Sequence, residues 1–523
     1  MDEAFAKPSQ DSVPGNHSLR PYYLLLFAFG GFLIVALLVL DAFAPSGRRV
    51  AKITGVDGPA YFGIAHSLLF DRDVDLTNEF QHITPEDRMW TLVQKSTGRP
   101  GSVYPIGYSL VSMPFLLAGY GVDALRGQGD GGYGRFAVLG FSLTNVFLAG
   151  CGLIALFTFL VRAGKSFGIE DRSPIIALLV CFAIFVGTDV GFYTFSPMSH
   201  IATFFWASLF LAWWWEIQSG TSAARWAVLG IMGGMLSVSR WQDFCYLGAP
   251  LLLDLLEKRY STDQAALLRS RAAYAVAAAV CWIPQVLEWK SIFGHYLTIP
   301  QGAGFFEFPP VHVAQVLFSS HSGWFFWTPI ALLGICGLVY GGIRVSRFYW
   351  PLLVVFALEL LVLGSLHVSW SGHDSFGARY LTSAVPLAAF GLATIFFTAR
   401  PLWRNTFAAF AAVSVAFTLL FAVQYRLDLI PRNNRLTARE AFGDKLHLEE
   451  AVKRRAAFLA ASGEMKAGDY QAAVRTLESA KAAYGADREL LEALASADRG
   501  AGSPAKVAMA KQQLRALLNS QLF

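Results

Sequence analysis

Residues 22–44 read YYLLLFAFGGFLIVALLVLDAFA, an apolar run that only Asp41 interrupts. A helix needs about 20 apolar residues to cross the hydrocarbon core of a bilayer, and this run is long enough. The segment that follows, residues 45–105, is polar and contains Asp57-Gly58-Pro59-Ala60-Tyr61. A membrane helix followed by a long polar loop with an early carboxylate predicts chemistry at the bilayer surface, because a simple anchor needs no such loop.

The composition of the chain indicates a polytopic membrane protein. Of its 523 residues, 54% are hydrophobic and 15% are charged, and the mean hydropathy is +0.44. Soluble domains of this size rarely combine these values. We therefore expect an all-α bundle of about 11 transmembrane helices. The expected spans lie near residues 22–44, 135–162, 174–192, 198–217, 225–239, 242–256, 272–288, 323–343, 349–366, 381–398 and 405–423.

The positions of Lys and Arg predict the orientation of these spans. With the N-terminus inside, the inner loops hold Arg162, Lys165, Arg172, Arg225, Lys258, Arg259, Arg269, Arg271, Arg344, Arg347, Arg400 and Arg404. The short outer loops 193–197 and 367–380 contain only Arg379. This asymmetry follows the positive-inside rule. We expect residues 1–21 to form a cytoplasmic tail, residues 22–423 the membrane domain and residues 424–523 an outer domain.

The large first outer loop, residues 45–134, is expected to carry interfacial helices. Tyr104-Pro105-Ile106-Gly107 leads into an apolar stretch that ends near Gly121. Because this stretch is short and contains Pro114, we expect an interfacial or re-entrant helix there.

The C-terminal tail has a different composition, with Ala, Glu, Lys and Leu at helical spacing over residues 445–523. Gly468-Asp469-Tyr470-Gln471-Ala472-Ala473 lies between two helical stretches and resembles the turn of one tetratricopeptide unit. Such repeats normally stack in threes, so an alanine-rich helical hairpin packed on the membrane domain stays an equal alternative. The tail is predicted to be a small, TPR-like helical domain.

Several functional classes are disfavoured by the sequence. The five cysteines lie in or beside apolar runs without a CxxC pair, which argues against a disulfide framework or a zinc motif. The net charge of +5 comes from loop residues that set the topology, so we expect no nucleic-acid partner. The chain shows no nucleophilic-serine elbow and no phosphate-binding glycine loop.

Asp57 is the first candidate for catalysis. It precedes a turn at Gly58-Pro59 and a segment with helical apolar spacing, so it is expected near a helix N-terminus, where the helix dipole favours a carboxylate. A carboxylate in this place suits a general base that removes a proton from a hydroxyl group. The alternative is that Asp57 only caps the helix.

Arg240 and Arg379 are the candidate anion-binding residues. Both interrupt or border apolar sequence at the outer ends of predicted spans, where a charge is costly and is usually paired or functional. Two interpretations stay open for each: an ion pair with a carboxylate such as Asp243, or contact with a lipid-linked phosphate through the two-pronged guanidinium group.

Aromatic and histidine side chains are candidates for substrate binding. His321 and Trp324 open a span on the outer side, and they fit either an interfacial belt or a platform for a sugar ring. Tyr61, Tyr104 and His373 lie in the other outer segments. His200 at a span start is expected to be an ordinary interface histidine.

Asp71-Arg72-Asp73-Val74-Asp75 is a second acidic group. Alternating aspartates suit a divalent cation such as calcium or magnesium, which prefers several oxygen ligands. Arg72 lies among them, however, and a solvated structural turn is the favoured interpretation.

Three features together resemble the GT-C superfamily of membrane glycosyltransferases: Asp57 after the first span, the stretch Tyr104-Pro105-Ile106-Gly107, and Ser375-Phe376-Gly377-Ala378-Arg379-Tyr380 before a span with Pro386. The likeness covers about residues 20–425 and is nearest to bacterial relatives of protein mannosyltransferases, aminoarabinose transferases and mycobacterial arabinofuranosyltransferases. The tail lies outside the shared core.

The resemblance implies transfer of a sugar from a polyprenyl-phosphate carrier to a glycan, lipid or protein acceptor of the cell envelope. The reaction would occur on the periplasmic face of a bacterial inner membrane. Asp57 matches the essential carboxylate of the first outer loop, and Arg240 and Arg379 match the residues that bind the carrier phosphate. Many relatives have a second acidic residue beside the first. Here Gly58 and Pro59 follow, so Asp73 or Asp75 would supply it. Relatives that use lipid monophosphate sugars often need no metal, and none is expected to be required.

Two other functional classes stay open. One is a transporter or flippase of a lipid-linked glycan, although the chain shows no internal repeat of the kind common in secondary transporters. The other is a membrane scaffold that presents the C-terminal helical domain to a partner.

Overall fold

The computed structural model describes residues 19–43, 53, 57–83, 94, 96–259, 263–367 and 369–519. Within these ranges the regular structure is helical, and the strand-like pairing there is one isolated antiparallel bridge between Phe306 and Leu366. The predicted all-α class is therefore confirmed.

Six helical segments of the described chain are long and apolar enough to cross a membrane, judged by length and composition. They are α1 (Arg20–Phe43), α4 (Gly107–Leu125), α5 (Arg135–Lys165), α11 (Gln264–Phe293), the segment Arg379–Thr398 and α17 (Pro401–Arg426). The shorter apolar helices are α6 (Ser173–Gly187), α9 (Ala223–Ser239), α14 (Pro329–Arg344) and α15 (Tyr349–Gly364). The chain is thus a multi-pass membrane protein, and the expected count of about 11 spans stays a prediction.

Several of these helices break into short turns at one end. The segment α6 is followed by α7 (Asp189–Tyr193), and α9 is followed by the 3-10 helix η4 (Trp241–Gly248) and α10 (Ala249–Leu256). The short α13 (Trp324–Trp327) precedes α14, and the 3-10 helix η7 (Arg379–Ala384) precedes α16 (Val385–Thr398). Irregular backbone is tolerated at membrane depth only where protein or a cavity surrounds it. These breaks place Arg240 and Arg379 between regular elements.

Helix α4 differs from the expected interfacial or re-entrant segment. It continues through Pro114 for 19 residues and meets the length and hydropathy of a span. It also packs closely on α5, because a Cβ atom on Gly140 would lie 2.1 Å from the carbonyl oxygen of Phe115. The helix thus accommodates Pro114 without a break while it packs against α5.

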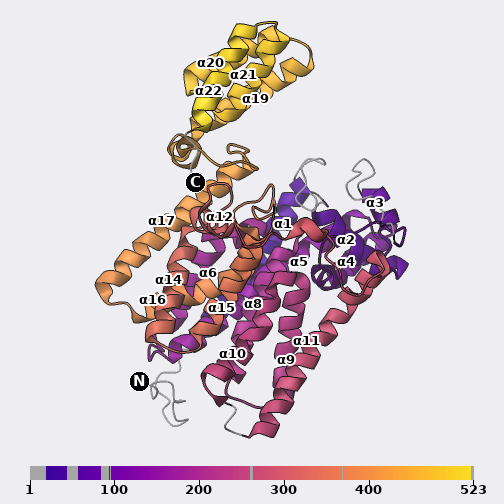
Figure 1. The fold of residues 1–523 in the computed structure, drawn as a ribbon, viewed down its shortest axis with the longest axis vertical. Helices are drawn as coiled ribbons and strands as arrows, with labels where there is room; N and C mark the ends of the chain where they lie inside the picture. The colour runs from indigo at the N-terminus through magenta and orange to yellow at the C-terminus, as the bar shows by residue number, and fades with distance from the viewer. Residues whose placement is uncertain are drawn as a thin grey trace.

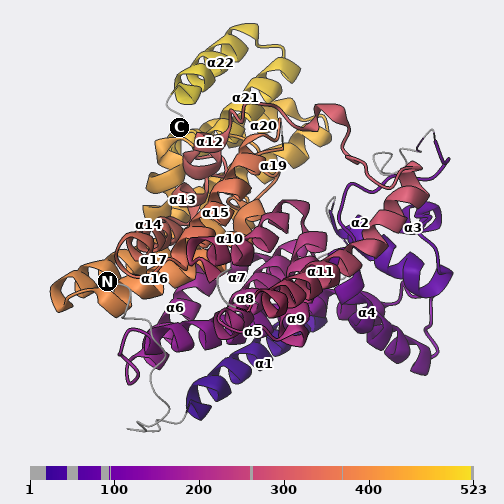
Figure 2. The same cartoon turned by 60° about the horizontal axis from the view of Figure 1, so that its bottom comes forward.

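The first outer loop and the tail lie at the same end of the bundle. Figure 1 shows α2 (Asp57–His66), α3 (Thr77–Ile83) and α12 (Val313–Phe318) at the upper end, where the yellow tail also stands. Figure 2 shows α2, α3 and α4 grouped at one flank, beside α11. Helix α8 (Ser199–Ile217) runs through the interior of the bundle, next to α5.

The tail contains two consecutive helical hairpins where the sequence suggested one. Its helices are α19 (Leu448–Lys466), α20 (Tyr470–Tyr484), α21 (Arg488–Gly500) and α22 (Pro504–Leu518), after the short α18 (Asp444–Leu446). They share a small core that is rich in alanine and includes Leu477, Leu490 and Leu494. The tail therefore has a core of its own, separate from the core of the membrane domain.

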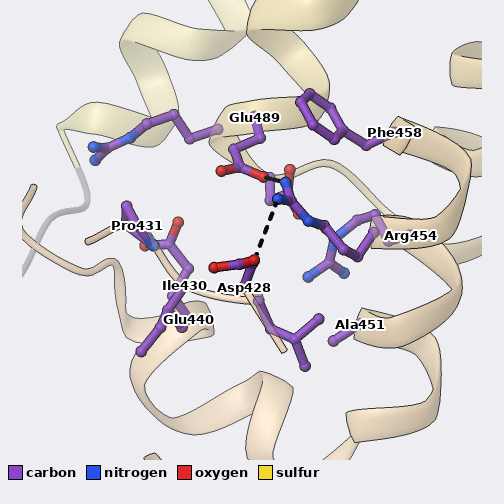
Figure 3. Close-up of a pocket in the computed structure, with 12 residues that line it drawn as sticks. Asp428, Ile430, Pro431, Glu440, Ala451, Arg454, Phe458 and Glu489 are labelled. Carbon is purple, nitrogen blue, oxygen red and sulfur yellow. Dashed lines mark hydrogen bonds and ion pairs between the residues drawn. The ribbon is translucent and has the colours of Figure 1, made fainter. Parts of the chain in front are cut away.

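Ion pairs hold the segments of the tail together. Arg454 is buried and pairs with Asp444 at 2.8 Å and with Asp487, and Arg455 pairs with Glu489. Figure 3 shows the side chains of Arg454, Glu489 and Asp428 converging around a small hollow. This hollow measures only about 20 Å³, so it has room for about one water molecule. The hollow therefore lies within the tail and offers no space for a substrate.

Gly107 is expected to be essential for the approach of α4 to α9. A Cβ atom there would lie 2.5 Å from the carbonyl oxygen of Val238, whereas a Cβ atom on Gly121 of the same helix meets nothing within 4 Å. Gly107→Ala should destabilise the protein by about 1–3 kcal/mol, the typical cost of overpacking. Gly121→Ala should be neutral or stabilising by up to about 1 kcal/mol, because alanine favours helix. Thermal unfolding in detergent compares the two variants, and equal stability would contradict the close approach.

Candidate functional site

Asp57 is buried at the first residue of α2 and contacts two residues that are distant in sequence. Its Oδ1 accepts a hydrogen bond from the hydroxyl group of Tyr104 at 2.8 Å, and its Oδ2 lies 3.2 Å from Nη1 of Arg379. The side chains of Asp57 and Arg379 are only 9% and 10% exposed. Within the described chain, both contacts of this carboxylate are therefore made with residues far away in the sequence. A residue that only caps a helix would need neither of them.

Arg379 follows the loop 369–378 and is the first residue of η7. Its Nη2 donates to the carbonyl oxygen of Gly372 at 2.8 Å while Nη1 faces Asp57. Gly372 has φ +77°, a left-handed conformation that favours glycine, and this turn directs its carbonyl oxygen at the guanidinium group. Tyr425 of α17 donates to the carbonyl oxygen of Asp374 and so holds the loop from the other side. The position of Arg379 is therefore set by its own loop.

Arg240 lies where α9 ends and the chain turns into η4. Its backbone is extended, with φ −152° and ψ 125°, which directs the side chain away from the helix axis. Nη1 lies 3.0 Å from Nδ1 of His200 and 3.4 Å from Oγ of Ser199, and the guanidinium group lies 4.3 Å from the centre of the Tyr380 ring. Asp243 instead accepts a hydrogen bond from Ser383. Among the described residues Arg240 forms no ion pair, so the first of its two open interpretations, an ion pair with Asp243, is not seen there.

Two buried tyrosines connect these charged groups. Tyr61 lies one helical turn after Asp57 on the same face of α2, and its hydroxyl group donates to Oγ of Ser199 at 2.8 Å. The rings of Tyr61 and Tyr104 are 5.2 Å apart. Burial, together with the nearby charge of Asp57, raises the pKa of both phenols above the usual value. Both therefore stay neutral and donate hydrogen bonds.

A cavity of about 490 Å³ lies on the far side of the loop that holds Arg379. Its lining residues are Glu307, Val311, His312, His321, His367, Trp370, Ser371, His373 and Asn433. Burial lowers the pKa of His321, so this imidazole is neutral near pH 7. Two of the candidate substrate-binding residues, His321 and His373, thus face this cavity. Trp324 is fully buried, stacks on Phe325 and does not line it.

The acidic residues of the first loop divide into two groups. Asp73 accepts hydrogen bonds from Ser67 and from the amide of Asp75, and Asp75 caps α3 through Thr77. Neither shares a partner with Asp57 in the described structure, so they are not brought together as a pair of carboxylates. Asp71 instead lies beside His66 and Glu79, which are the described residues that could hold a metal ion.

Sequence reasoning missed Ser199 and Tyr380 and gave His200 no role in the site. Ser199 and His200 are the first residues of α8, and Tyr380 follows Arg379, so all three lie at the outer ends of predicted spans. A polar residue beside the end of an apolar run was the available signal. It does not distinguish a site residue from a residue that only faces the interface.

Comparison with known proteins finds a limited similarity of fold to a solved structure. No protein-family model and no curated protein matches the chain. Among solved structures, it is similar to the crystal structure of the Archaeoglobus fulgidus oligosaccharyltransferase in complex with Zn and sulfate, with 13% identity and a TM-score of 0.42. The match covers 76% of this chain and 53% of that chain, so the present chain spans about half the length of that protein. At this identity and TM-score, the likeness carries no conclusion about activity.

The ion pair between Asp57 and Arg379 is expected to be energetically coupled. Loss of either partner leaves the other charge buried, which typically costs about 3–5 kcal/mol. Asp57→Asn and Arg379→Gln should each lower the unfolding temperature, and the double variant should lose less than the sum of the two. The exposed pair Glu478 and Lys506 of the tail supplies the control, because surface pairs contribute about 0–1 kcal/mol. A double-mutant cycle by thermal unfolding tests this, and additive losses at Asp57 and Arg379 would contradict it.

Proposed function

We propose that this protein is a GT-C-type glycosyltransferase that moves a sugar from a polyprenyl-phosphate carrier to a cell-envelope acceptor on the outer face of the membrane. The observation that carries the proposal is the convergence of two arginines, Arg240 and Arg379, on the ring of Tyr380 beside Asp57. Asp57 pairs with Arg379, whereas Arg240 has Ser199 and His200 as its hydrogen-bond partners among the described residues. The sequence resemblance to membrane glycosyltransferases agrees with this arrangement.

The two guanidinium groups suit a phosphate ligand. They lie 4.3 and 5.5 Å from the centre of the same Tyr380 ring, so they flank one small region. The Nε atoms of both arginines are buried without a hydrogen-bond partner in the described structure. Unpaired buried donors are rare, and a guanidinium group binds two phosphate oxygens at once. A bound phosphodiester, the linkage in a polyprenyl-phosphate sugar, would accept hydrogen bonds from these donors and pair with the guanidinium charges.

Asp57 suits the general base of an inverting transfer. Each of its oxygens makes one recorded contact, and a carboxylate oxygen has a further lone pair that can accept from the acceptor hydroxyl group. The acceptor oxygen would bond to the anomeric carbon as its proton moves to Asp57. The bond from that carbon to the phosphate oxygen breaks, and its electron pair leaves with the polyprenyl phosphate. Arg240 and Arg379 would stabilise the developing charge.

Two cavities have linings whose polarity suits the two proposed substrates. The cavity lined by His321, Trp370 and His373 offers aromatic and polar groups of the kind that bind sugars or polar acceptors. A second, apolar cavity of about 500 Å³ lies between α6, α7 and α17, with Phe192, Phe376 and Arg426 among its lining residues. Its apolar walls suit a polyprenyl chain, and Phe376 belongs to the loop that holds Arg379.

Transport of a lipid-linked glycan is the alternative. It is favoured by a pair of buried carboxylates in the membrane domain, Asp243 and Glu359, which share the hydroxyl group of Ser383. Acidic groups at this depth often take part in proton-coupled movement. The alternative makes no use of Asp57 as a base, so the experiments below separate the two functions.

Asp57→Asn should lower the rate of sugar transfer by about 10²–10⁴-fold, the usual loss when a positioned general base is removed. The assay incubates detergent-purified protein with radiolabelled polyprenyl-phosphate sugars and envelope extract, and it follows label that leaves the lipid. Asp73→Asn is the matched control, because Asp73 is an acidic residue of the same loop with local turn contacts. Substantial transfer by a folded Asp57→Asn protein would remove Asp57 from the mechanism. A wild-type protein that moves lipid between leaflets without transfer would establish transport instead.

Arg240→Gln should raise the KM for the polyprenyl-phosphate sugar and also lower kcat, because the phosphate carries charge in both the bound state and the transition state. Arg225→Gln serves as the control. Arg225 is exposed at the opposite end of the same helix, α9, where its side chain stacks on Trp213. Donor saturation curves of the two variants give the comparison. An unchanged KM in Arg240→Gln would exclude Arg240 as a phosphate ligand.

A further inference from the structure

Three side chains of the first outer loop direct their ligand atoms toward one point. His66 ends α2, Asp71 ends the π-helical turn η2 (Ser67–Asp71), and Glu79 lies in α3. Their ligand atoms all lie within 4.8 Å of one another. Nδ1 of His66 is 3.1 Å from Oε1 of Glu79 and 4.0 Å from Oδ2 of Asp71. This cluster is separate from the contacts of Asp57.

The hydrogen bond at Nε2 of His66 determines whether Nδ1 of the neutral ring carries a proton or a lone pair. Nε2 lies 2.7 Å from the carbonyl oxygen of Gly131, which can only accept, so Nε2 carries the proton. In the neutral imidazole, Nδ1 therefore presents a lone pair to the carboxylates of Glu79 and Asp71. Three acceptors that face one another require a proton or a cation between them. A backbone carbonyl that holds the far N–H group is also the usual outer partner of a metal-bound histidine.

Glu79 supplies an independent observation. Its side chain is fully buried, and its Oε2 has no hydrogen-bond partner in the described structure. A proton between His66 and Glu79 would satisfy Oε1 and leave Oε2 unsatisfied, which is costly in a buried carboxylate. A cation bound to one carboxylate oxygen offsets the negative charge of the whole group, including that of Oε2. The side-chain amide of Asn78 donates to Asp71 at 2.9 Å and to Glu79 at 3.3 Å, which orients both carboxylates toward the common point.

We propose that His66, Asp71 and Glu79 form a binding site for a divalent transition metal, best matched by zinc. One imidazole and two carboxylates are zinc ligands, and three protein ligands leave a fourth position for water on the exposed side of Asp71. Ligand atoms about 2.1 Å from a tetrahedral zinc lie about 3.4 Å apart. The pair of His66 and Glu79, 3.1 Å apart, is close to this spacing, whereas Asp71, 4.0 Å from His66, would have to move closer to bind the same ion. Calcium and magnesium prefer oxygen ligands, so the imidazole disfavours them.

The site joins α2 and the turn η2 that continues it to α3, and His66 also connects it to the backbone of the glycine-rich turn at Gly131. The ring of His66 stacks on Tyr133 at 4.1 Å, and Gly132 has no room for a side chain, because a Cβ atom would lie 2.5 Å from the ring of Phe70. The metal would therefore fix the C-terminal end of the helix whose first residue is Asp57. Its role is positional, and no step of the proposed transfer passes through it.

The test measures zinc binding by the full chain, independently of any transferase activity. Detergent-purified, tag-free protein is stripped with a chelator and titrated with zinc sulfate against a chromogenic chelator, and bound zinc is counted by mass spectrometry after desalting. We expect one zinc per wild-type chain and a rise in the unfolding temperature on binding. X-ray absorption should show a first shell of nitrogen and oxygen atoms with one imidazole.

Glu79→Gln and Asp71→Asn should weaken zinc binding on the order of 100-fold and abolish the thermal shift, since each removes a charged ligand. Asp71 is exposed, so Asp71→Asn tests the site without disturbing the core. Asp75→Asn and His82→Gln are matched controls in the same loop and should bind zinc like the wild type. The proposal is overturned if folded wild-type protein binds less than one zinc, if the ligand variants keep wild-type affinity, or if the controls lose binding equally.

Discussion

The buried ion pair between Asp57 and Arg379 is the contact on which the candidate site depends. It joins the first outer loop to the loop before α16 across the whole membrane domain, and Tyr104 and Gly372 fix its two ends. Burying two charges is costly, and their attraction offsets that cost only when both are well oriented. The pair therefore constrains both loops together. Arg240 reaches the same region from α9 and forms no ion pair among the described residues.

Much of the fold and part of the site could be predicted from the sequence, for one physical reason. Apolar runs of membrane length have few alternatives to helices, and a charge at the end of such a run is costly unless it is paired or used. Asp57, Arg240 and Arg379 stood out for this reason, and the structure brings them into one region. Their convergence itself could not be predicted, because it depends on how α9 breaks at Arg240 and how the loop turns at Gly372.

The remaining differences come from tertiary contacts that leave little signal in the sequence. Pro114 and the short apolar stretch suggested an interfacial or re-entrant helix, whereas α4 is a continuous helix that packs closely on α5. The row of aspartates was interpreted as a structural turn, and Asp73 and Asp75 do bond within the local turns, while Asp71 meets His66 and Glu79. That meeting requires the π-helical turn η2 and the left-handed backbone of Arg72, with φ 62°. Such a turn brings together side chains whose separation in the sequence fits neither the period of an α-helix nor that of a strand.

Helix α2 connects the candidate site at Asp57 with the cluster at His66. All ten of its residues are buried, so small residues such as Gly58, Ala60 and Gly63 must allow neighbours on every side. At 1.5 Å per residue the helix is about 15 Å long, and it is held at Asp57 by Arg379 and at His66 by Glu79 and Gly131. A rigid helix fixed at both ends keeps its first carboxylate in one place, which is what a base acting on a bound hydroxyl group requires. An ion bound at His66 would thus act on the position of Asp57 through the helix, without contact with either substrate.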